Sequence, residues 1–183
     1  VGYGFEISER FGTPVLLRLT TRLAHSRAGV TVKGPIQENT VRLPTDPRQF
    51  ILLPSIARGR YKALLGNQAN FEESAEKSDY NTYHRGEDKS LGIITSGIAY
   101  NYLMENYPKG DCPYSVLKIG QYPLPHKQVE SIVDEVDEVM VMEEGYPFIE
   151  EMLRGFLDRT HRIKGRLDGA LPRDGELNPS LVA

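Results

Sequence analysis

The chain has 183 residues, a single cysteine and a formal net charge of −3 at pH 7. A weak negative charge with scattered basic residues excludes an electrostatic surface for nucleic acid or for an anionic membrane. One thiol, Cys112, can form neither an internal disulfide nor a cysteine-based metal site, and no apolar run reaches the roughly 18 residues of a membrane span. We therefore expect a globular cytoplasmic protein that binds neither nucleic acid nor a membrane.

The first 26 residues predict a helix followed by a strand. Tyr3, Ile7 and Phe11 repeat every four residues, as on one face of a helix, and Gly12 is suited to end that helix. The apolar run 15–20 then predicts a mostly buried strand. The chain starts without methionine, inside the expected helix. We interpret residues 1–26 as the C-terminal end of an upstream domain, in a segment excised from a longer protein.

Residues 27–89 predict a long linker with a helical segment. Prolines keep its first half irregular, up to residue 54. Residues 55–80 contain no proline, and a thin apolar stripe there predicts one or two helices, formed by Ile56, Tyr61, Leu64, Leu65 and Phe71. A linker of this length typically spans two domains or contacts a partner. The tyrosines between residues 80 and 122 would suit such an interface.

Residues 90–183 show the clearest alternation of strand and helix. We expect strands at 91–94, 114–119 and 139–142, and helices at 98–105 and near 129–136. Pro147 opens a further helix with a broad core face, made of Phe148, Ile149, Met152, Leu153, Phe156 and Leu157. Residues 161–165 are a candidate edge strand. The alternation predicts an α/β fold, with three α/β/α layers around a mostly parallel sheet.

Two short motifs lie at the expected ends of strands. Thr95-Ser96-Gly97 opens a helix, where an anion could bind, but it lacks the spacing of a dinucleotide or P-loop motif. We expect Ser96 to cap that helix and Gly97 to permit close packing. Glu143 and Glu144 follow the third strand, where paired carboxylates could do acid–base work. Adjacent residues in an extended segment point apart, so we expect these two to be structural.

The other ionisable residues predict neither a metal site nor a catalytic centre. The histidines are far apart and lack metal-ligand spacing: His25, His84, His126 and His161. Cys112 has no basic neighbour to lower its pKa, so we expect an inert thiol. Four acidic residues interrupt the apolar face of the helix expected near 129–136, and we expect them on its solvated side: Asp134, Glu135, Asp137 and Glu138.

Four segments match one known family in the same order along the chain. Residues 5–18 (FEISERFGTPVLLR), with Thr20-Thr21-Arg22 and His25-Ser26-Arg27, resemble the end of a pyrimidine-binding domain. Residues 91–100 (LGIITSGIAY) and then 118–120 with 122–125 (KIG, YPLP) resemble the first two strands of the next domain. Its closing helix and tail are matched by Glu143-Glu144, residues 147–150 (PFIE) and residues 171–177 (LPRDGEL). Together these segments resemble the alpha subunits of the thiamine-diphosphate-dependent indolepyruvate:ferredoxin oxidoreductases, of which this chain would be an internal fragment.

The resemblance implies an activity that belongs to the whole subunit. That subunit would bind thiamine diphosphate and Mg²⁺, carry 4Fe–4S clusters and convert aryl 2-oxoacids to acyl-CoA with coenzyme A. Its partners would be a beta subunit and ferredoxin. Residues 90–183 would form a transketolase C-terminal-like domain that serves structure and homodimerisation. The resemblance carries over no catalytic residue and implies no cofactor bound to this fragment. Thr21 and Arg22 would lie closest to a substrate or partner.

Two alternatives remain open at this point. The chain could be a free-standing nucleotide- or coenzyme-binding α/β module that uses Ser96 and Gly97. It could also belong to a pyruvate or 2-oxoglutarate oxidoreductase of the same superfamily, since the residues that select the substrate would lie mostly elsewhere.

Overall fold

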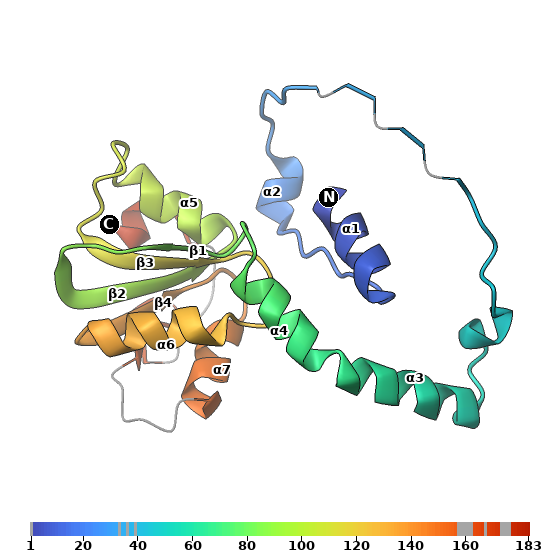
Figure 1. Ribbon diagram of the computed structural model, residues 1–183. Coiled ribbons are helices and arrows are strands. Elements are labelled where there is room, and N and C mark those ends of the chain that lie inside the picture. The colour runs from blue at the N-terminus through green and yellow to red at the C-terminus, as the bar shows by residue number, and fades with distance from the viewer. Residues whose placement is uncertain are drawn as a thin grey trace. The chain divides into compact units, whose positions relative to one another are not determined.

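The computed structural model describes residues 2–32, 34–35, 37–38, 40–156, 163–166, 168–172 and 177–183. The chain divides into two compact units, unit 1 (Val1–Gln68) and unit 2 (Ala69–Ala183) (Figure 1). The domain borders expected at residues 26 and 89 remain predictions. No helix in the described part of the chain is long and apolar enough to cross a membrane.

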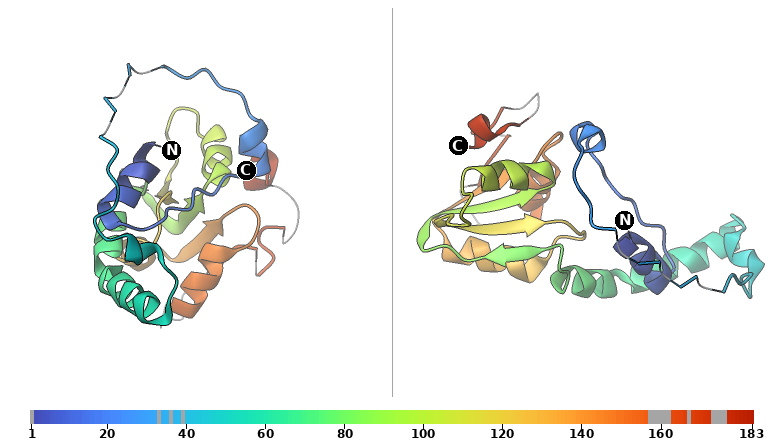
Figure 2. Two further views of the ribbon diagram at one scale, coloured as in Figure 1. Left: turned by 90° about the vertical axis from the view of Figure 1, so that its right-hand side faces the viewer. Right: turned by 90° about the horizontal axis from the view of Figure 1, so that it is seen from above.

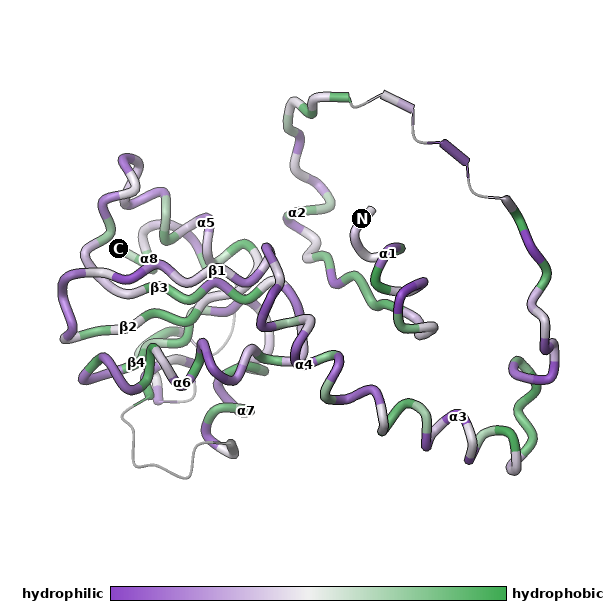
Figure 3. Tube along the Cα trace, in the orientation of Figure 1, coloured by the Kyte–Doolittle hydropathy of each residue, from purple (hydrophilic) through white to green (hydrophobic). Residues whose placement is uncertain are grey.

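Unit 1 consists of short helices and extended chain. Its helices are α1 (Gly2–Phe11), α2 (Thr21–His25), η1 (Pro47–Phe50) and α3 (Pro54–Gly66). The predicted first helix is confirmed, and Gly12 ends it with a φ of 59°. No described residue of this unit is buried. Hydrophobic residues nevertheless recur along the extended segment and into α3 (Figure 3).

The prediction of a strand at residues 15–20 is wrong. Residues 14–20 belong to no helix or strand, and α2 follows them directly. Leu16 is 93% exposed and Leu19 is 59% exposed. An apolar run forms a strand only where a neighbouring strand accepts its backbone hydrogen bonds, and no described residue provides one.

The described strands of unit 2 form a five-stranded sheet in the order β1-β3-β2-β4-β5. They are β1 (Thr82–His84), β2 (Asp88–Ser96), β3 (Tyr114–Ile119), β4 (Glu138–Met142) and β5 (Ile163–Lys164). All neighbouring pairs are parallel except β1 with β3. The predicted strands and the mostly parallel sheet are confirmed. The antiparallel edge strand β1 was not expected, and residues 161–162 of the candidate edge strand lie outside the described residues.

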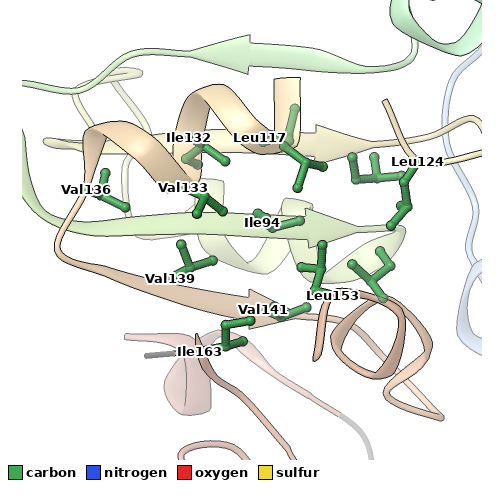
Figure 4. Packing of buried hydrophobic residues seen from close by; sticks show 13 residues of the cluster. Ile94, Leu117, Leu124, Ile132, Val133, Val136, Val139, Val141, Leu153 and Ile163 are labelled. Carbon is green, nitrogen blue, oxygen red and sulfur yellow. The ribbon is translucent and has the colours of Figure 1, made fainter. Parts of the chain in front are cut away.

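Helices cover both faces of this sheet, which gives three layers (Figure 2). One face packs against α5 (Ile98–Glu105) and α8 (Pro179–Val182). The other packs against α6 (His126–Glu135) and α7 (Phe148–Phe156). Figure 4 shows the second of these two cores, with Ile94 and Leu117 of the sheet facing Ile132 and Val133 of α6. The predicted three-layer α/β fold is confirmed.

Close packing fixes α6 on the sheet. A Cβ added to Gly92 of β2 would lie 2.9 Å from Val136 Cγ2 and 3.0 Å from Ile132 Cγ1.

The helix α4 (Gln68–Glu76) caps the start of α6, because the Glu76 carboxylate accepts the backbone N–H of Lys127 at 2.7 Å. Pro125, at the N-cap of α6, has no side chain that could do this. The linker was predicted to contain one or two helices, and the structure has two, α3 and α4, of which α4 belongs mostly to unit 2.

A polar network ties the edge strand β1 to α6. The Glu135 carboxylate accepts hydrogen bonds from the hydroxyls of Tyr83 and of Ser115, the latter at 2.6 Å. Lys89 Nζ lies 3.4 Å from the same carboxylate and Arg85 3.7 Å from it. The prediction that Glu135 lies on the solvated side of its helix is therefore wrong. Burial raises the pKa of the Tyr83 hydroxyl, and Glu135 raises it further.

We expect Glu135 to stabilise the fold at neutral pH and to lose that effect in acid. Burial raises its pKa, but the hydrogen bonds from Ser115, Tyr83 and Lys89 outweigh burial and hold the pKa below the ordinary value of 4.5. The stabilisation is therefore complete above the unfolded-state pKa and disappears as the pH falls through the folded-state pKa. Glu135→Gln should lower the free energy of unfolding by about 1–2 kcal/mol at pH 7.

Urea unfolding at pH 7 and at successively lower pH measures this effect. The difference between the wild type and Glu135→Gln should shrink toward zero in acid. Glu130→Gln, on the exposed side of the same helix, should show no such dependence. A difference for Glu135→Gln that does not change with pH would contradict the proposed role of the carboxylate.

Candidate functional site at the carboxyl edge of the sheet

The parallel strands β2, β3 and β4 end at the same edge of the sheet, where α/β proteins place their sites. The chain leaves β2 toward α5 on one face, and leaves β3 and β4 toward α6 and α7 on the other. The neighbouring strands β2 and β4 therefore send their connections to opposite faces, which places the topological switch point between the carboxyl ends of β2 and β4. The two motifs selected from the sequence both lie here.

The motif after β2 differs from its prediction in two ways. Ser96 is the last residue of β2, and the N-cap of α5 is Gly97, which makes no side-chain capping bond. The prediction that Ser96 caps the helix is therefore wrong. Gly97 has a φ of 59°, and a Cβ there would meet nothing within 4 Å. Its backbone conformation, rather than close packing, requires glycine. Thr95 is fully buried.

Asn81 holds the connection after β3. Its Oδ1 accepts the backbone N–H groups of Gly120 and Gln121 at 2.8 and 2.9 Å. Its Nδ2 donates to the carbonyls of Ala75 and Gln121 at 2.9 and 3.0 Å. The side chain is 5% exposed and uses both of its donors and both acceptor sites. Asn81 thereby joins the end of α4 to the end of β3.

Glu143 holds the start of α7. Its two carboxylate oxygens accept the backbone N–H groups of Ile149 and Glu150, each at 3.0 Å. The residue is 2% exposed. Burial raises its pKa, and the backbone hydrogen bonds only partly oppose this. A carboxylate bound to two helix N–H groups serves as a cap, and is not positioned as an acid or base.

Glu144 lies apart from this arrangement. Both of its carboxylate oxygens are buried and have no hydrogen-bond partner in the described part of the chain. The structure therefore gives the two adjacent carboxylates different surroundings, as their alternating directions predict. A buried carboxylate without a partner is costly, so Glu144 is a liability for stability in this conformation.

Two arginines and the buried carboxylate of Glu150 close the edge at β4 and β5. Arg166, 2% exposed, donates from Nε to the carbonyl of Glu143 at 2.9 Å. Arg154 Nε donates to Glu150 at 3.2 Å, and its Nη2 donates to the carbonyl of Ile163 at 3.1 Å. A Cβ added to Gly165 would lie 2.5 Å from the Glu150 carboxylate. The cluster fixes α7 against β5.

Asp168 stabilises the turn after β5. Its Oδ1 accepts the backbone N–H groups of Gly165 at 2.9 Å and Ala170 at 3.1 Å. Burial raises the pKa of this carboxyl, but the two N–H groups outweigh burial and hold the pKa below its usual value. The carboxylates of Glu143 and Asp168 therefore both position backbone at this edge.

The remaining candidates lie elsewhere. Thr21 and Arg22 are exposed residues of α2, and their role at a substrate or partner edge stays a prediction. Burial raises the pKa of the Cys112 thiol, which agrees with the expected inert thiol. Among the described residues, no group of three His, Cys, Asp or Glu side chains could hold a metal ion. His161 lies outside those residues.

Sequence reasoning missed the residues that do most at this edge: Asn81, Glu150, Arg154, Arg166 and Asp168. Only Glu150 and Arg154 have a fixed spacing, the i,i+4 spacing of an ion pair on a helix. The only signal for Asn81 in the sequence was its position, as a polar residue directly before the short, polar segment Thr82-Tyr83-His84.

No family model matches the chain, but curated proteins are similar along its whole length. The chain is 32% identical over 188 residues to indolepyruvate oxidoreductase subunit IorA of Methanothermobacter thermautotrophicus, which covers 100% of this chain and 30% of that protein. It is 33% identical over 182 residues to the IorA subunit of Archaeoglobus fulgidus, covering 97% of this chain and 29% of that protein. The IorA subunit of Pyrococcus abyssi is 32% identical to it over 162 residues, which cover 84% of this chain and 25% of that protein.

Solved structures are similar as well, among them 2-oxoglutarate:ferredoxin oxidoreductase from Magnetococcus marinus with 2-oxoglutarate, coenzyme A and succinyl-CoA bound. It is 13% identical with a TM-score of 0.44, and covers 62% of this chain and 20% of that chain. A likeness of this size carries no conclusion. The curated relatives lead to the identification: the chain is related, along its whole length, to one part of the indolepyruvate oxidoreductase IorA subunits, and spans about 30% of the length of the first two.

Proposed function

We propose that this chain is part of the alpha subunit of a thiamine-diphosphate-dependent indolepyruvate:ferredoxin oxidoreductase, in which it serves structure and dimerisation. The observation that carries the proposal is the similarity to IorA subunits along the whole chain. The whole cytoplasmic enzyme, with a beta subunit and ferredoxin as partners, would oxidise aryl 2-oxoacids to acyl-CoA. Thiamine diphosphate, Mg²⁺, 4Fe–4S clusters and coenzyme A would supply that chemistry.

In this proposal the chain contains pieces of two domains. Residues 1–26 are the end of a pyrimidine-binding domain, residues 27–89 are a linker, and residues 90–183 are a transketolase C-terminal-like domain. The lack of any buried residue in the described part of unit 1 supports a segment that completes its packing against other parts of the subunit. Unit 2, by contrast, has a core on each face of its sheet.

The residues of this chain fit neither the 4Fe–4S clusters nor the Mg²⁺ of the whole enzyme. A 4Fe–4S cluster is held by several cysteines, and the chain has one. Mg²⁺ prefers carboxylates with room for water, whereas Glu143 and Asp168 accept backbone N–H groups. We therefore derive no chemical step within the chain, and propose that its carboxyl edge serves to hold loops and α7.

Sedimentation equilibrium of the 183-residue chain tests the proposed dimerisation. We expect a species of twice 20.6 kDa that dissociates on dilution. A monomer at every concentration would overturn the dimerising role, and would leave the relationship to IorA subunits untouched.

A further inference from the structure

Two polar side chains at the switch point between β2 and β4 have oxygens that form no hydrogen bond with any described residue. They are the hydroxyl oxygen of Thr95 and both carboxylate oxygens of Glu144, and all of them are buried. Thr95 is fully buried as a residue, whereas Glu144 is partly exposed, so its side chain reaches inward from the surface. Nearly all buried polar groups of folded proteins are hydrogen-bonded. These oxygens therefore lack the partners that a fold normally supplies.

The strand register puts both residues on the α5 face of the sheet. Thr95 of β2 pairs with Met142, the last residue of β4, and Met142 packs in the core on the α5 side. Side chains alternate along an extended chain, so Glu143 points toward α7, whose start it caps, and Glu144 points toward the α5 side. Glu144 thus follows the register partner of Thr95 by two residues, on the same face.

The chain also leaves open space directly after Thr95. A Cβ added to Gly97 would meet no atom within 4 Å, and Gly97, as the N-cap of α5, makes no side-chain bond. Gly97 lies two residues after Thr95, at the point where β2 passes into α5. In open α/β sheets, ligands bind in the crevice outside the carboxyl ends of the strands, at the switch point. The unbonded oxygens of Thr95 and Glu144 lie at that place.

The α7 face of the same edge differs, because the carboxylate that faces α7 is already bonded to the helix. Only half of the described side chains expected in the core face of α7 are buried: Ile149 and Leu153 are at 0% exposure, but Phe148 and Met152 are at 44% and 37%. The prediction that Phe148 and Met152 lie in the core is therefore wrong. Leu157 and the side chain of Phe156, expected in the same face, lie outside the described residues. This side of the edge exposes apolar surface instead of unbonded acceptors.

The three oxygens favour a ligand that is positively charged and carries several N–H groups. A buried carboxylate without a counter-charge is costly, and a hydrogen-bonded cation offsets that cost. A water molecule would supply donors but no charge. A metal ion needs more ligands than one carboxylate and one hydroxyl, and the described residues hold no group of three His, Cys, Asp or Glu side chains for it. A guanidinium group fits best, since it is planar, always charged, and donates two parallel N–H bonds to a carboxylate.

We propose that Glu144 and Thr95 form a binding site for a guanidinium group. The two oxygens of Glu144 accept a pair of parallel N–H bonds, and the hydroxyl of Thr95 accepts another, because the group carries five N–H donors. The site explains the cost of Glu144 in the free chain, since proteins break the rules of stability mostly at functional sites. This inference goes beyond the structural role proposed above and does not depend on dimerisation.

Titration of the isotope-labelled 183-residue chain, followed by NMR, tests the site. The probe is N-acetyl-arginine methylamide, which presents the guanidinium as a polypeptide would. We expect saturable shifts of the backbone N–H signals of Gly97 and Gly145, with a dissociation constant of about 1 mM. N-acetyl-citrulline methylamide is the matched control ligand, because it has nearly the same shape without the charge, and it should not bind at such concentrations. Agmatine serves as the probe for a free guanidinium compound.

Three variants place the binding at these side chains. Glu144→Gln should weaken binding of the arginine probe about tenfold or more, because it removes the charge and one acceptor. Thr95→Val should weaken it by a smaller factor. Glu105→Gln makes the first of these changes at an exposed position at the other end of α5, and should leave binding unaltered. In the absence of ligand, neither Glu144→Gln nor Thr95→Val should lower stability to urea, because each changes a buried group that has no described partner.

The outcomes separate the proposal from its alternatives. Saturable binding of the blocked arginine supports an arginine of another polypeptide as the ligand, and binding of agmatine alone supports a free guanidinium compound. Absence of binding by both probes, equal binding of the citrulline control, or unaltered binding by Glu144→Gln would overturn the site. A clear loss of stability in ligand-free Glu144→Gln would also overturn it, since the carboxylate would then have a donor within the chain.

Discussion

Asn81→Ala should lower the free energy of unfolding by about 3–5 kcal/mol, because each buried polar group left without its partner costs about 1–3 kcal/mol. The substitution removes the only described side chain that bonds the N–H groups of Gly120 and Gln121 and the carbonyls of Ala75 and Gln121. Water can reach part of the Gln121 loop, so the loss stays below the sum of four separate penalties. Urea denaturation measures the change.

Two further variants separate this explanation from a general effect of mutation. Asn81→Asp keeps the acceptor for the two N–H groups but places a carboxylate oxygen against the two carbonyls, so we expect this variant to be destabilised as well. Asn101→Ala, at an exposed position of α5, should change stability by less than about 0.5 kcal/mol. A loss for Asn81→Ala no greater than that for Asn101→Ala would show that the hydrogen bonds around Asn81 do not hold this connection.

Glu143→Ala should lower the free energy of unfolding by about 2–5 kcal/mol, because two buried N–H groups of α7 lose their acceptor. The neighbouring substitution Glu144→Ala should have nearly no effect or should stabilise the protein. It removes a buried carboxylate that has no hydrogen-bond partner in the described part of the chain. The two residues are identical in type and adjacent in sequence, so each is a control for the other.

Thermal unfolding of both alanine variants, followed by circular dichroism, compares them directly. We expect a clear fall in Tm for Glu143→Ala and an unchanged or higher Tm for Glu144→Ala. Equal losses would contradict the assignment of Glu143 as the cap of α7. They would also indicate that Glu144 has a partner in solution.

The hydrophobic pattern sufficed for the central elements of unit 2. The helix at 98–105 and the strand at 114–119 have the predicted bounds, because each buries apolar side chains at the period of its own structure. Val129, Ile132 and Val133 lie in the core as their spacing predicts. Local periodicity indicates whether a helix or strand can bury one of its own faces. In unit 2 helices cover both faces of the sheet, so these segments do bury their apolar faces.

The errors share a different physical cause, dependence on residues far away in the sequence. The apolar run 15–20 has strand composition but no described partner strand, while the polar Thr82-Tyr83-His84 forms β1 because β3 offers a free edge. Phe148 and Met152 are as apolar as Ile149 and Leu153, and only the position of the sheet decides which pair is buried. The roles of Asn81 and Arg166 depend on backbone groups that the fold alone brings near.

Calorimetric titration of the purified chain with thiamine diphosphate and Mg²⁺ is the most direct test of the central claim, that this part of the subunit is structural. We expect no heat of binding from a chain that circular dichroism shows to be folded. Tight binding with one cofactor per chain would contradict it, because the cofactor site would then lie among these residues.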